Sequence, residues 1–426
     1  MKKILYVFII SVIALFVLNK IVYEEVPDKN IKEQLSEIER YKHPVTSISM
    51  DYRNNSDLKV FDSILKDNKV LILGENTHID GSTFEAKSRL IKYLHENLNY
   101  NVVLYEAGQY DTWIMNEEMN HHQLKTHTDS IGGLGLFEFW WNTKETQPLI
   151  RYYQKTKASA TPIETGGFDI QFPGGLLTSS KRGNLLKDFL SRNNIHSNNF
   201  PIFNKHINEL NHFIHRKYVN RILKGNQKKE FLQEIAALEQ AVLKLDKTPE
   251  NIMYARYFHD IKDNMTKNWN YKPGSMPSMQ FRDSVMARNL VHQIDSVYKD
   301  KKIIVWCANI HSFAERYSKD YLPLGFYIRN KYGASSYIID FSSYAQLNET
   351  GSTSDKPGKF AIENLFHKTK TPYFFLNLRN IPESSFLKKE FVSTINQRTD
   401  MKRNWSRSFD GIFYIDINKT LTPIKK

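Results

Sequence analysis

The sequence has a single cysteine, Cys307, among 426 residues. One cysteine cannot form an intramolecular disulfide, and it cannot supply a cysteine-based zinc cage or an iron–sulfur cluster. Because Cys307 lies inside an apolar, strand-like run, we expect a small buried residue rather than a nucleophile. The cysteine content therefore excludes a disulfide scaffold and says nothing of the compartment.

Two familiar catalytic signatures are also missing. No G-x-S-x-G sequence occurs, which disfavours a serine hydrolase of the usual α/β type. No H-E-x-x-H sequence occurs either, so the spacing that makes a zinc-binding helix specific is absent.

Acidic residues are fewer than basic ones, with 46 Asp and Glu against 59 Lys and Arg, a net charge of +13. The basic residues are scattered, and no basic stripe is interleaved with aromatic residues, so we expect no nucleic-acid partner. The charge leaves room for an acidic membrane surface or an anionic substrate. A hydrophobic content of 41% predicts a sizeable folded core.

The N-terminus carries an uncharged apolar run. Lys2 and Lys3 precede Ile4–Leu18, as in the positive and hydrophobic regions of an export signal. Continued to Tyr23, the run has about twenty residues, enough to span a bilayer, and no small-residue cleavage site follows. We predict a signal anchor over residues 1–23, with a cleaved signal peptide as the alternative. The positive-inside rule then places the catalytic part outside the cytoplasm, membrane-anchored or, after cleavage, secreted or periplasmic.

Three further segments differ in composition. Residues 24–58 are polar and predict a stalk, and residues 59–426 are expected to form one α/β domain. Within that domain, residues 181–270 change to long Lys- and Glu-rich helical periodicity. We interpret this stretch as a large helical insertion that forms a wall or lid over the carboxyl ends of the strands.

Short apolar runs that end in polar residues give the main signal for the fold. Such runs, followed by helical periodicity, predict a central, mostly parallel sheet flanked by helices. In these sheets ligands bind outside the carboxyl ends of the strands. The runs are Val70–Leu73, Val102–Tyr105, Gly167–Phe168 and Ile303–Trp306, and the polar residues that follow them are Glu75, His78, Glu106, Asp169, Asn309 and His311.

Glu75 and His78 come directly after the first of these runs. Glu75 is placed to fix the tautomer of His78, and His78 to act as general base on a water molecule. The alternative is a helix-capping Glu with a structural His. Glu106 ends the second run, where a carboxylate is rarely buried without a partner, such as His78, Lys87 or Arg89. Its alternative is a capping role at the next helix.

His311 follows the last run and has two candidate roles. It can donate to a developing oxyanion or act as a second acid or base, and the alternative is a core histidine satisfied by the backbone. Glu75, His78, Glu106 and His311 together also offer enough nitrogen and oxygen ligands for a catalytic divalent ion. We expect no cofactor, and metal binding is the second interpretation.

The order of several short motifs resembles the erythromycin esterase family. The resemblance extends from Val70 to Phe341 and is carried by the ordered set rather than by any one motif. The motifs are Gly74-Glu75-Asn76-Thr77-His78, Phe84-Glu85-x-Lys87-x-Arg89-Leu90, Glu106-Ala107, Trp141-Asn142-Thr143-x-Glu145, Gly167-Phe168-Asp169-x-Gln171, Arg282-Asp283-x-x-Met286-Ala287-x-Asn289, Val305-Trp306-x-x-Asn309-x-His311, Leu324-Gly325 and Lys331-Tyr332-Gly333.

The resemblance implies metal-independent hydrolysis of an ester or lactone, with the histidine of the G-E-x-T-H motif as the base. That role falls on His78, with Glu75 and Glu106 as its carboxylate partners and His311 as a further catalytic residue. The expected partner is a small-molecule ester or lactone. The residues that the resemblance places in contact with it are Lys87, Arg89, Trp141, Asp169, Arg282 and Asn309.

Three positions depart from the family pattern. Ala308 stands where the family has the first histidine of His-Asn-x-His, Ile79 follows the base where a glycine is usual, and Lys87 replaces a common arginine. The replacement of Arg by Lys keeps the charge but loses the bidentate fork. The changes at Ala308 and Ile79 bear on specificity for macrolide lactones and leave the hydrolytic core in place. Two alternatives to a hydrolase stay open. One is a metal- or haem-binding protein, because broader relatives share the G-E-x-x-H motif, and the other is a non-catalytic relic scaffold, which the missing histidine at position 308 supports.

Overall fold

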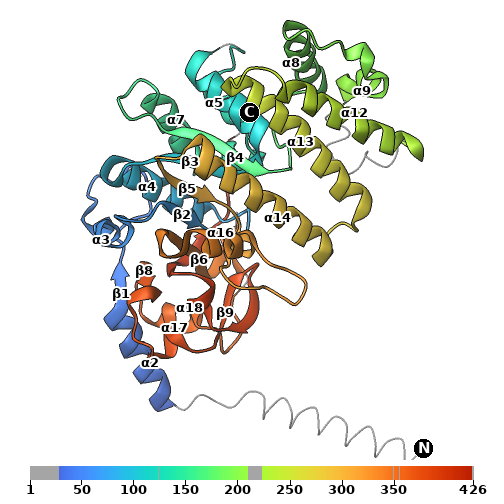
Figure 1. The fold of residues 1–426 in the computed structure, drawn as a ribbon. Helices are drawn as coiled ribbons and strands as arrows, with labels where there is room; N and C mark the ends of the chain where they lie inside the picture. The colour runs from blue at the N-terminus through green and yellow to red at the C-terminus, as the bar shows by residue number, and fades with distance from the viewer. Residues whose placement is uncertain (1–27, 123, 210–222, 349, 355, 425–426) are drawn as a thin grey trace, which may run out of the picture.

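The computed structural model describes residues 28–122, 124–209, 223–348, 350–354 and 356–424. The described residues form an α/β fold around one large sheet flanked by helices, as predicted (Figure 1). In spatial order the strands are β1 (Lys42–Pro44), β8 (Tyr373–Asn377), β11 (Gly411–Lys419), β6 (Ser336–Leu347), β2 (Val70–Leu73), β5 (Lys302–Trp306), β3 (Tyr100–Gly108) and β4 (Glu164–Asp169), and the short β7 (Thr353–Ser354) pairs with β6.

The sheet is mostly parallel. Every pairing from β11 through β6, β2, β5 and β3 to β4 is parallel, whereas β8 pairs antiparallel with β11 and β1 antiparallel with β8. The four predicted apolar runs are the neighbouring strands β2, β5, β3 and β4. Because these strands are parallel neighbours, their carboxyl ends lie side by side at one edge of the sheet.

Successive residues of the central strands face two different hydrophobic cores. In β2, Leu71 and Leu73 belong to one core, and Val70 and Ile72 belong to the other. This alternation follows from the two-residue period of a strand that is covered on both faces. The first core includes residues of α3 (Val60–Leu65), α4 (Gly81–Leu98), α5 (Gln109–His121) and α7 (Gln147–Thr156), and the second includes residues of α2 (Asp28–Tyr41), α14 (Met276–His292), α16 (Leu324–Tyr332) and α17 (Glu363–Lys368).

The segment predicted as a polar stalk, residues 24–58, is folded onto the domain from Asp28 onward. It forms α2 and then β1, which pairs with β8 at one edge of the sheet. Ile38, Val45 and Ile48 are buried, which explains the correction, because these few apolar residues in a polar stretch suffice to dock it. The predicted anchor over residues 1–23 lies outside the described residues. In the part of the chain described, no helix is long and apolar enough to cross a membrane.

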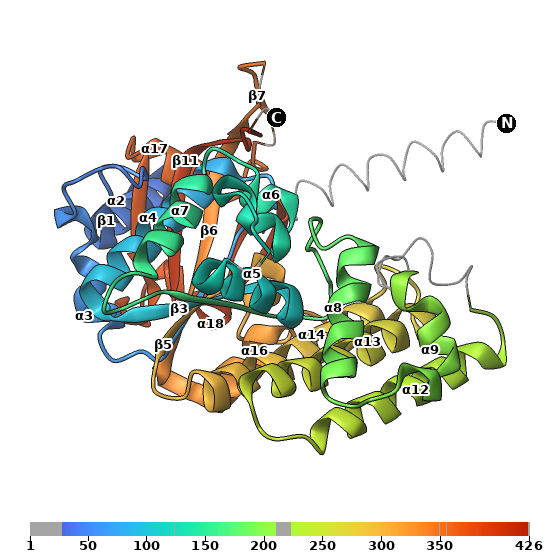
Figure 2. The same ribbon diagram turned by 90° about the horizontal axis from the view of Figure 1, so that it is seen from above.

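The described part of residues 181–270, predicted as a helical insertion, forms a group of helices beside the β4 edge of the sheet (Figures 1 and 2). Asn264 near the end of α13 donates to the carbonyl of Ile170, directly after β4, at 2.7 Å. The end of α13 therefore reaches the strand ends and forms a side wall there. Its helices are α8 (Ser179–Arg192), α9 (Pro201–His206), α12 (Asn226–Leu243) and α13 (Pro249–Asn270).

A buried ion pair attaches the insertion to the domain. The guanidinium of Arg182 on α8 donates to both carboxylate oxygens of Asp111 on α5, at 2.5 and 3.1 Å, and the two side chains are 1% and 0% exposed. Asp111 also accepts from the backbone N–H of Gly174 at 2.9 Å. Removing one partner of such a pair leaves an uncompensated buried charge.

We expect Asp111→Ala to lower the free energy of unfolding by about 3–5 kcal/mol, because it leaves the Arg182 guanidinium buried and unpaired. The matched control is Glu250→Ala, which removes an exposed ion pair with Arg192. The side chains of Arg192 and Glu250 are 59% and 38% exposed. That loss should stay within about 1 kcal/mol. Urea titrations of the two variants measure both values, and equal destabilisation would contradict the assignment.

Candidate active site

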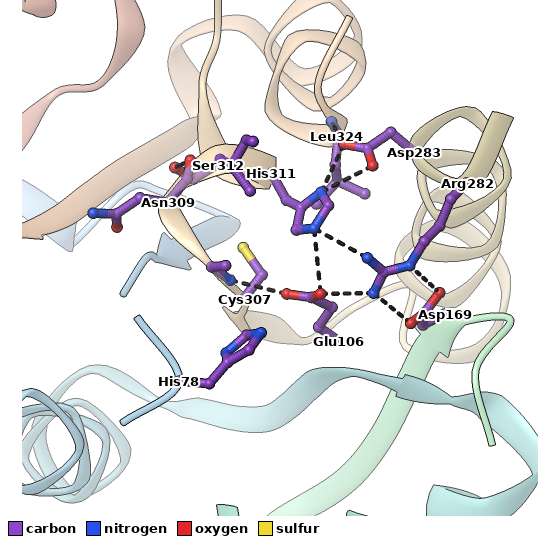
Figure 3. A network of polar contacts seen from close by, with 12 residues as sticks. His78, Glu106, Asp169, Arg282, Asp283, Cys307, Asn309, His311, Ser312 and Leu324 are labelled. Atoms are coloured by element: carbon purple, nitrogen blue, oxygen red, sulfur yellow. Dashed lines mark hydrogen bonds and ion pairs between the residues drawn. The ribbon is translucent and has the colours of Figure 1, made fainter. Parts of the chain in front are cut away.

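The carboxyl ends of β2, β3, β4 and β5 bring the predicted polar residues to one place. Glu75 and His78 follow β2, Glu106 lies near the end of β3, and Asp169 is the last residue of β4. His311 lies on α15 (Asn309–Ser312), which follows β5. Figure 3 shows Glu106 between His78 and the pair formed by Arg282 and His311.

Gly74 allows the end of β2 to approach its neighbours closely. A Cβ atom at this position would lie 2.1 Å from Oδ1 of Asn309 and 2.3 Å from Oδ1 of Asp340. No side chain larger than hydrogen fits in that space. The glycine before Glu75 is therefore required by packing at the strand end.

Glu75 is fully buried and accepts four hydrogen bonds. Its Oε1 accepts from His78 Nδ1 at 2.7 Å and from Trp140 Nε1 at 3.1 Å. Its Oε2 accepts from Lys87 Nζ at 2.7 Å and from Trp306 Nε1 at 2.6 Å. A carboxylate oxygen only accepts, so a neutral His78 must carry its proton on Nδ1. The other ring nitrogen, Nε2, is then the basic one.

His78 is the accessible member of this group, with its side chain 40% exposed. Its ring stacks on Phe139 at 4.8 Å and meets the edge of Trp140 at 5.5 Å. It lines a cavity of about 310 Å³ together with Asn76 and Thr77 of its own segment and residues from two other segments, namely Ala308, Ile310, Asn396 and Gln397. The imidazole is thus held by its neighbours and open to a small molecule.

The charges around His78 favour its protonated form. Burial lowers the pKa of His78, but the hydrogen bond from its Nδ1 to Glu75 and the negative charges of Glu75 and Glu106 outweigh burial. The pKa of His78 is therefore raised above its ordinary value. A base with a raised pKa is stronger, although less of it is neutral at a given pH.

Glu106 lies at the centre of a second network. Its Oε1 accepts from Arg282 Nη2 at 2.7 Å, and its Oε2 accepts from the backbone N–H of Ala308 at 2.9 Å. Arg282 also binds Asp169 in a fork, with Nε–Oδ1 at 3.0 Å and Nη2–Oδ2 at 2.7 Å. Burial raises the pKa of Glu106, but the charges of His311 and Arg282 hold it well below its usual value. Glu106 is therefore a carboxylate at neutral pH.

His311 is held between two carboxylates. Its Nδ1 lies 2.9 Å from Oδ2 of Asp283, and its Nε2 lies 3.3 Å from Oε1 of Glu106. Asp283 in turn accepts from the Tyr321 hydroxyl and the Leu324 backbone N–H, each at 2.9 Å. Burial lowers the pKa of His311, but Asp283 and Glu106 raise it to about 10. His311 is then an imidazolium at neutral pH, which can stabilise negative charge but cannot accept a proton.

A second cavity of about 270 Å³ opens beside Arg282. It lies between the segment after β4, the end of α13 and the start of α14. Amide and aromatic side chains dominate its wall, which consists of Phe137, Gln171, Phe172, Asn264, Lys267, Asn268, Gly274, Ser278, Met279 and Arg282. The stacked rings of Phe137 and Phe139, 5.2 Å apart, continue this wall to His78.

Several residues expected to contact substrate have other partners. Arg89 pairs with Asp57 at 2.7 Å and is buried, so it docks the N-terminal segment. Trp141 is buried against Gly132, and a Cβ atom added to Gly132 would lie 2.5 Å from the Cβ atom of Trp141. The structure therefore corrects both assignments to structural roles, because the two side chains are buried in contacts with the rest of the protein.

Lys87 and Asn309 act behind the site. Lys87 is fully buried on Glu75, and the amide of Asn309 donates to the backbone carbonyls of Phe341, at 3.0 Å, and Ile395. Neither Glu75 nor Glu106 caps a helix, since α4 follows Asp80 and α5 follows Gly108. Cys307 is buried, and burial raises the pKa of its thiol well above its usual value, as expected for an inert residue.

Three contributors were missed from the sequence. Trp140 was passed over for its neighbour Trp141, although successive residues of α6 (Glu138–Trp141) point about 100° apart. From the sequence, Trp306 is predicted only as an apolar strand residue. Asp283 is included in a motif, and no role is assigned to it. Each of these residues could have been noticed in the sequence, because an indole N–H or a carboxylate within a buried segment needs a hydrogen-bond partner there.

The chain is similar to two curated proteins over most of its length. One is a protein of Bacillus subtilis named "Putative hydrolase YbfO", 27% identical over 349 residues, which are 75% of this chain and 74% of that protein. The other is erythromycin esterase type II of Escherichia coli, 22% identical over 415 residues, which are 88% of this chain and 96% of the relative.

The fold also matches a solved structure. A Bacillus cereus protein superposes with a TM-score of 0.75 at 18% identity, covering 93% of this chain and all of that one. At this identity the match supports the fold only.

The family model described as erythromycin esterase matches residues 95–417. This range includes Glu106, Asp169, Arg282 and His311 and begins after the Gly74–His78 motif. It covers most of the chain, so the chain belongs to the erythromycin esterase family.

Proposed function

We propose that the protein hydrolyses a carboxylic ester or lactone and that His78 activates the attacking water directly. The observation that carries this proposal is the hydrogen bond from His78 Nδ1 to the buried Glu75, at 2.7 Å, which leaves Nε2 as the basic nitrogen beside an open cavity. The hydrolase family supports the reaction class. The substrate in this proposal is a small-molecule ester or lactone.

The reaction follows from the positions of these groups. Water in the cavity gives a proton to Nε2 of His78, and its oxygen attacks the carbonyl carbon of the substrate. Glu75 and Glu106 stabilise the imidazolium that forms. His78 then returns the proton to the leaving alkoxide as the carbon–oxygen bond breaks. A base of this kind contributes about 10²–10⁴-fold to the rate.

The developing oxyanion needs positive charge nearby. Arg282 and His311 lie on the far side of Glu106 from His78, and both remain charged at neutral pH (Figure 3). Arg282 also lines the 270 Å³ cavity, which gives its guanidinium access to a bound molecule. We assign the oxyanion interaction to the Arg282 guanidinium, with His311 adding positive charge beside it. Lys87 and Asn309 are buried and line neither cavity.

The metal- or haem-binding alternative fits these residues poorly. In the described ranges, no three His, Cys, Asp or Glu side chains converge as a metal site. His311 presents its nitrogens to Asp283 and Glu106, and His78 presents Nδ1 to Glu75. The relic-scaffold alternative rests on Ala308, which lines the cavity beside His78 and leaves space where the family has an imidazole.

For the location, we propose that the catalytic domain lies outside the cytoplasm and is attached through the N-terminal segment. The support is the composition of residues 1–23, in which two lysines precede an uncharged apolar run. The folded domain begins within a few residues of that segment, because α2 starts at Asp28.

We expect His78→Ala to fold normally and to lose at least ~10²-fold in kcat/KM toward the esters or lactones that the unaltered protein cleaves. The side chain is partly exposed, so its removal leaves no sealed cavity. The control is His121→Ala, which removes a 57% exposed histidine on α5 and should leave activity unchanged. Near-normal turnover by folded His78→Ala would exclude His78 as the base.

The pH profile tests the pairing with Glu106. A base must be neutral to act, so kcat/KM should rise with pH through the raised pKa of His78. Glu106→Gln removes one of the negative charges that raise this pKa, so the acid limb should move to lower pH even if the maximal rate falls. The measurement is kcat/KM from about pH 5 to 9 for both forms. The control Glu96→Gln, at a surface position, should leave the limb in place. An acid limb that stays or moves upward in Glu106→Gln would rule out the pairing.

A further inference from the structure

A second hollow lies at the opposite end of α14 from Arg282. It consists of two adjoining cavities of about 650 and 300 Å³, which share Ile252, His292 and Ser296. Its walls are α12 and α13 of the insertion on one side, and the end of α14 with the following π-helix η5 (Gln293–Val297) on the other. Residues of α5 and β4 complete the wall of the smaller cavity. Arg282 and His292 are ten residues apart on α14, about 15 Å along the helix, so this groove is separate from the candidate active site.

Exposed apolar side chains gather at this groove. Leu243, Ile252 and Val297 are 42%, 37% and 47% exposed and all line it. They are most of the large hydrophobic side chains that are exposed in the described residues, the others being Ile79 and Met276. The smaller cavity is the more apolar part, lined also by Trp113, Met253 and Tyr298. A concentration of exposed apolar surface in a hollow marks a binding site better than the same residues scattered singly.

The larger cavity contains an arginine that forms no direct ion pair in the described part of the chain. Arg256 lines it, and no carboxylate in the described part of the chain forms an ion pair with its guanidinium. The acids nearby are occupied elsewhere. Glu239 accepts from His259 and Lys262 at 2.8 Å each, Asp263 pairs with Arg288, and Asp295 pairs with Lys331. Burial and the neighbouring Arg288 lower the pKa of Arg256, and the negative charges of Asp260 and Glu239 offset them only in part.

His292 provides a second polar group at the junction of the two cavities. Its Nε2 is buried and has no hydrogen-bond partner. Burial and the charge of Arg256 lower the pKa of His292 to about 4, so the ring is neutral at physiological pH. A neutral imidazole can present an N–H at Nε2, and a buried donor without a partner is unfavourable.

We propose that this groove binds an amphipathic carboxylate. The carboxylate lies between the Arg256 guanidinium and Nε2 of His292, and the apolar chain runs past Ile252 into the smaller cavity toward Val297. One ligand then gives Arg256 a direct ion pair, satisfies the unpartnered donor of His292 and covers the exposed apolar side chains. The cavity volumes are those of ordinary small-molecule sites. The site needs no reaction and is independent of the proposed hydrolysis.

Isothermal titration of the full chain with octanoate tests the proposal. We expect one octanoate per chain. Acetate lacks the chain and 1-octanol lacks the charge, so each should bind at least about tenfold more weakly. Equal affinities for acetate and octanoate would indicate a simple anion site and overturn the proposed ligand class. Absence of octanoate binding would overturn the site itself.

Two variants locate the ligand within the groove. Arg256→Gln should weaken octanoate binding about tenfold or more and leave 1-octanol binding unchanged, because only the charged contact is lost. Val297→Asn, at a 47% exposed position that tolerates a polar residue, should weaken octanoate and 1-octanol together. The control Arg192→Gln removes an exposed arginine on α8 that is paired with Glu250 and should bind octanoate as the unaltered chain does. Unchanged octanoate affinity in both groove variants would place the ligand elsewhere and refute the proposal.

Discussion

The buried carboxylate of Glu75 is the interaction on which the geometry of the site depends. Its four donors come from His78 after β2, Lys87 on α4, Trp140 on α6 and Trp306 on β5. A buried carboxylate is unfavourable unless every oxygen accepts hydrogen bonds, so these four contacts stabilise one another's positions. The same contacts hold the His78 ring in one orientation and set its tautomer. The contacts that pack this end of the sheet are therefore also the contacts that orient the proposed base.

The two histidines near the strand ends differ because their surroundings differ. His78 has a single carboxylate in contact and an open side, so its pKa is raised while the ring remains able to exchange protons with a water molecule. His311 is buried between Asp283 and Glu106, and its pKa of about 10 keeps it charged. Glu106 connects the two, since it contacts His311 directly and its charge acts on His78. The proposed division between a proton-accepting His78 and a charge-stabilising His311 follows from how deeply each ring is buried and how many carboxylates contact it.

The parallel strands and the polar residues after them could be predicted because both depend on local patterns. Apolar runs bounded by polar residues identify β2, β3 and β5, and the rule for parallel sheets then places Glu75, Glu106 and His311 together. Contacts made across long sequence separations could not be predicted in this way. The sequence predicts a substrate contact for Arg89, whereas the structure places Asp57 beside it. Trp140 and Trp141 differ only in which face of a short helix they occupy. The docking of β1 likewise depends on β8, more than three hundred residues away.

The central claim is that Glu75 holds His78 with its proton on Nδ1 and leaves Nε2 as the base. Nitrogen-15 NMR of the chain labelled at histidine measures this directly and needs no substrate, with the His78 signals assigned by their loss in His78→Gln. Neutral His78 should show a protonated Nδ1 and an unprotonated Nε2, and it should titrate above the ordinary histidine value of 6.5. A neutral ring protonated on Nε2, or a titration below 6.5, would contradict the account.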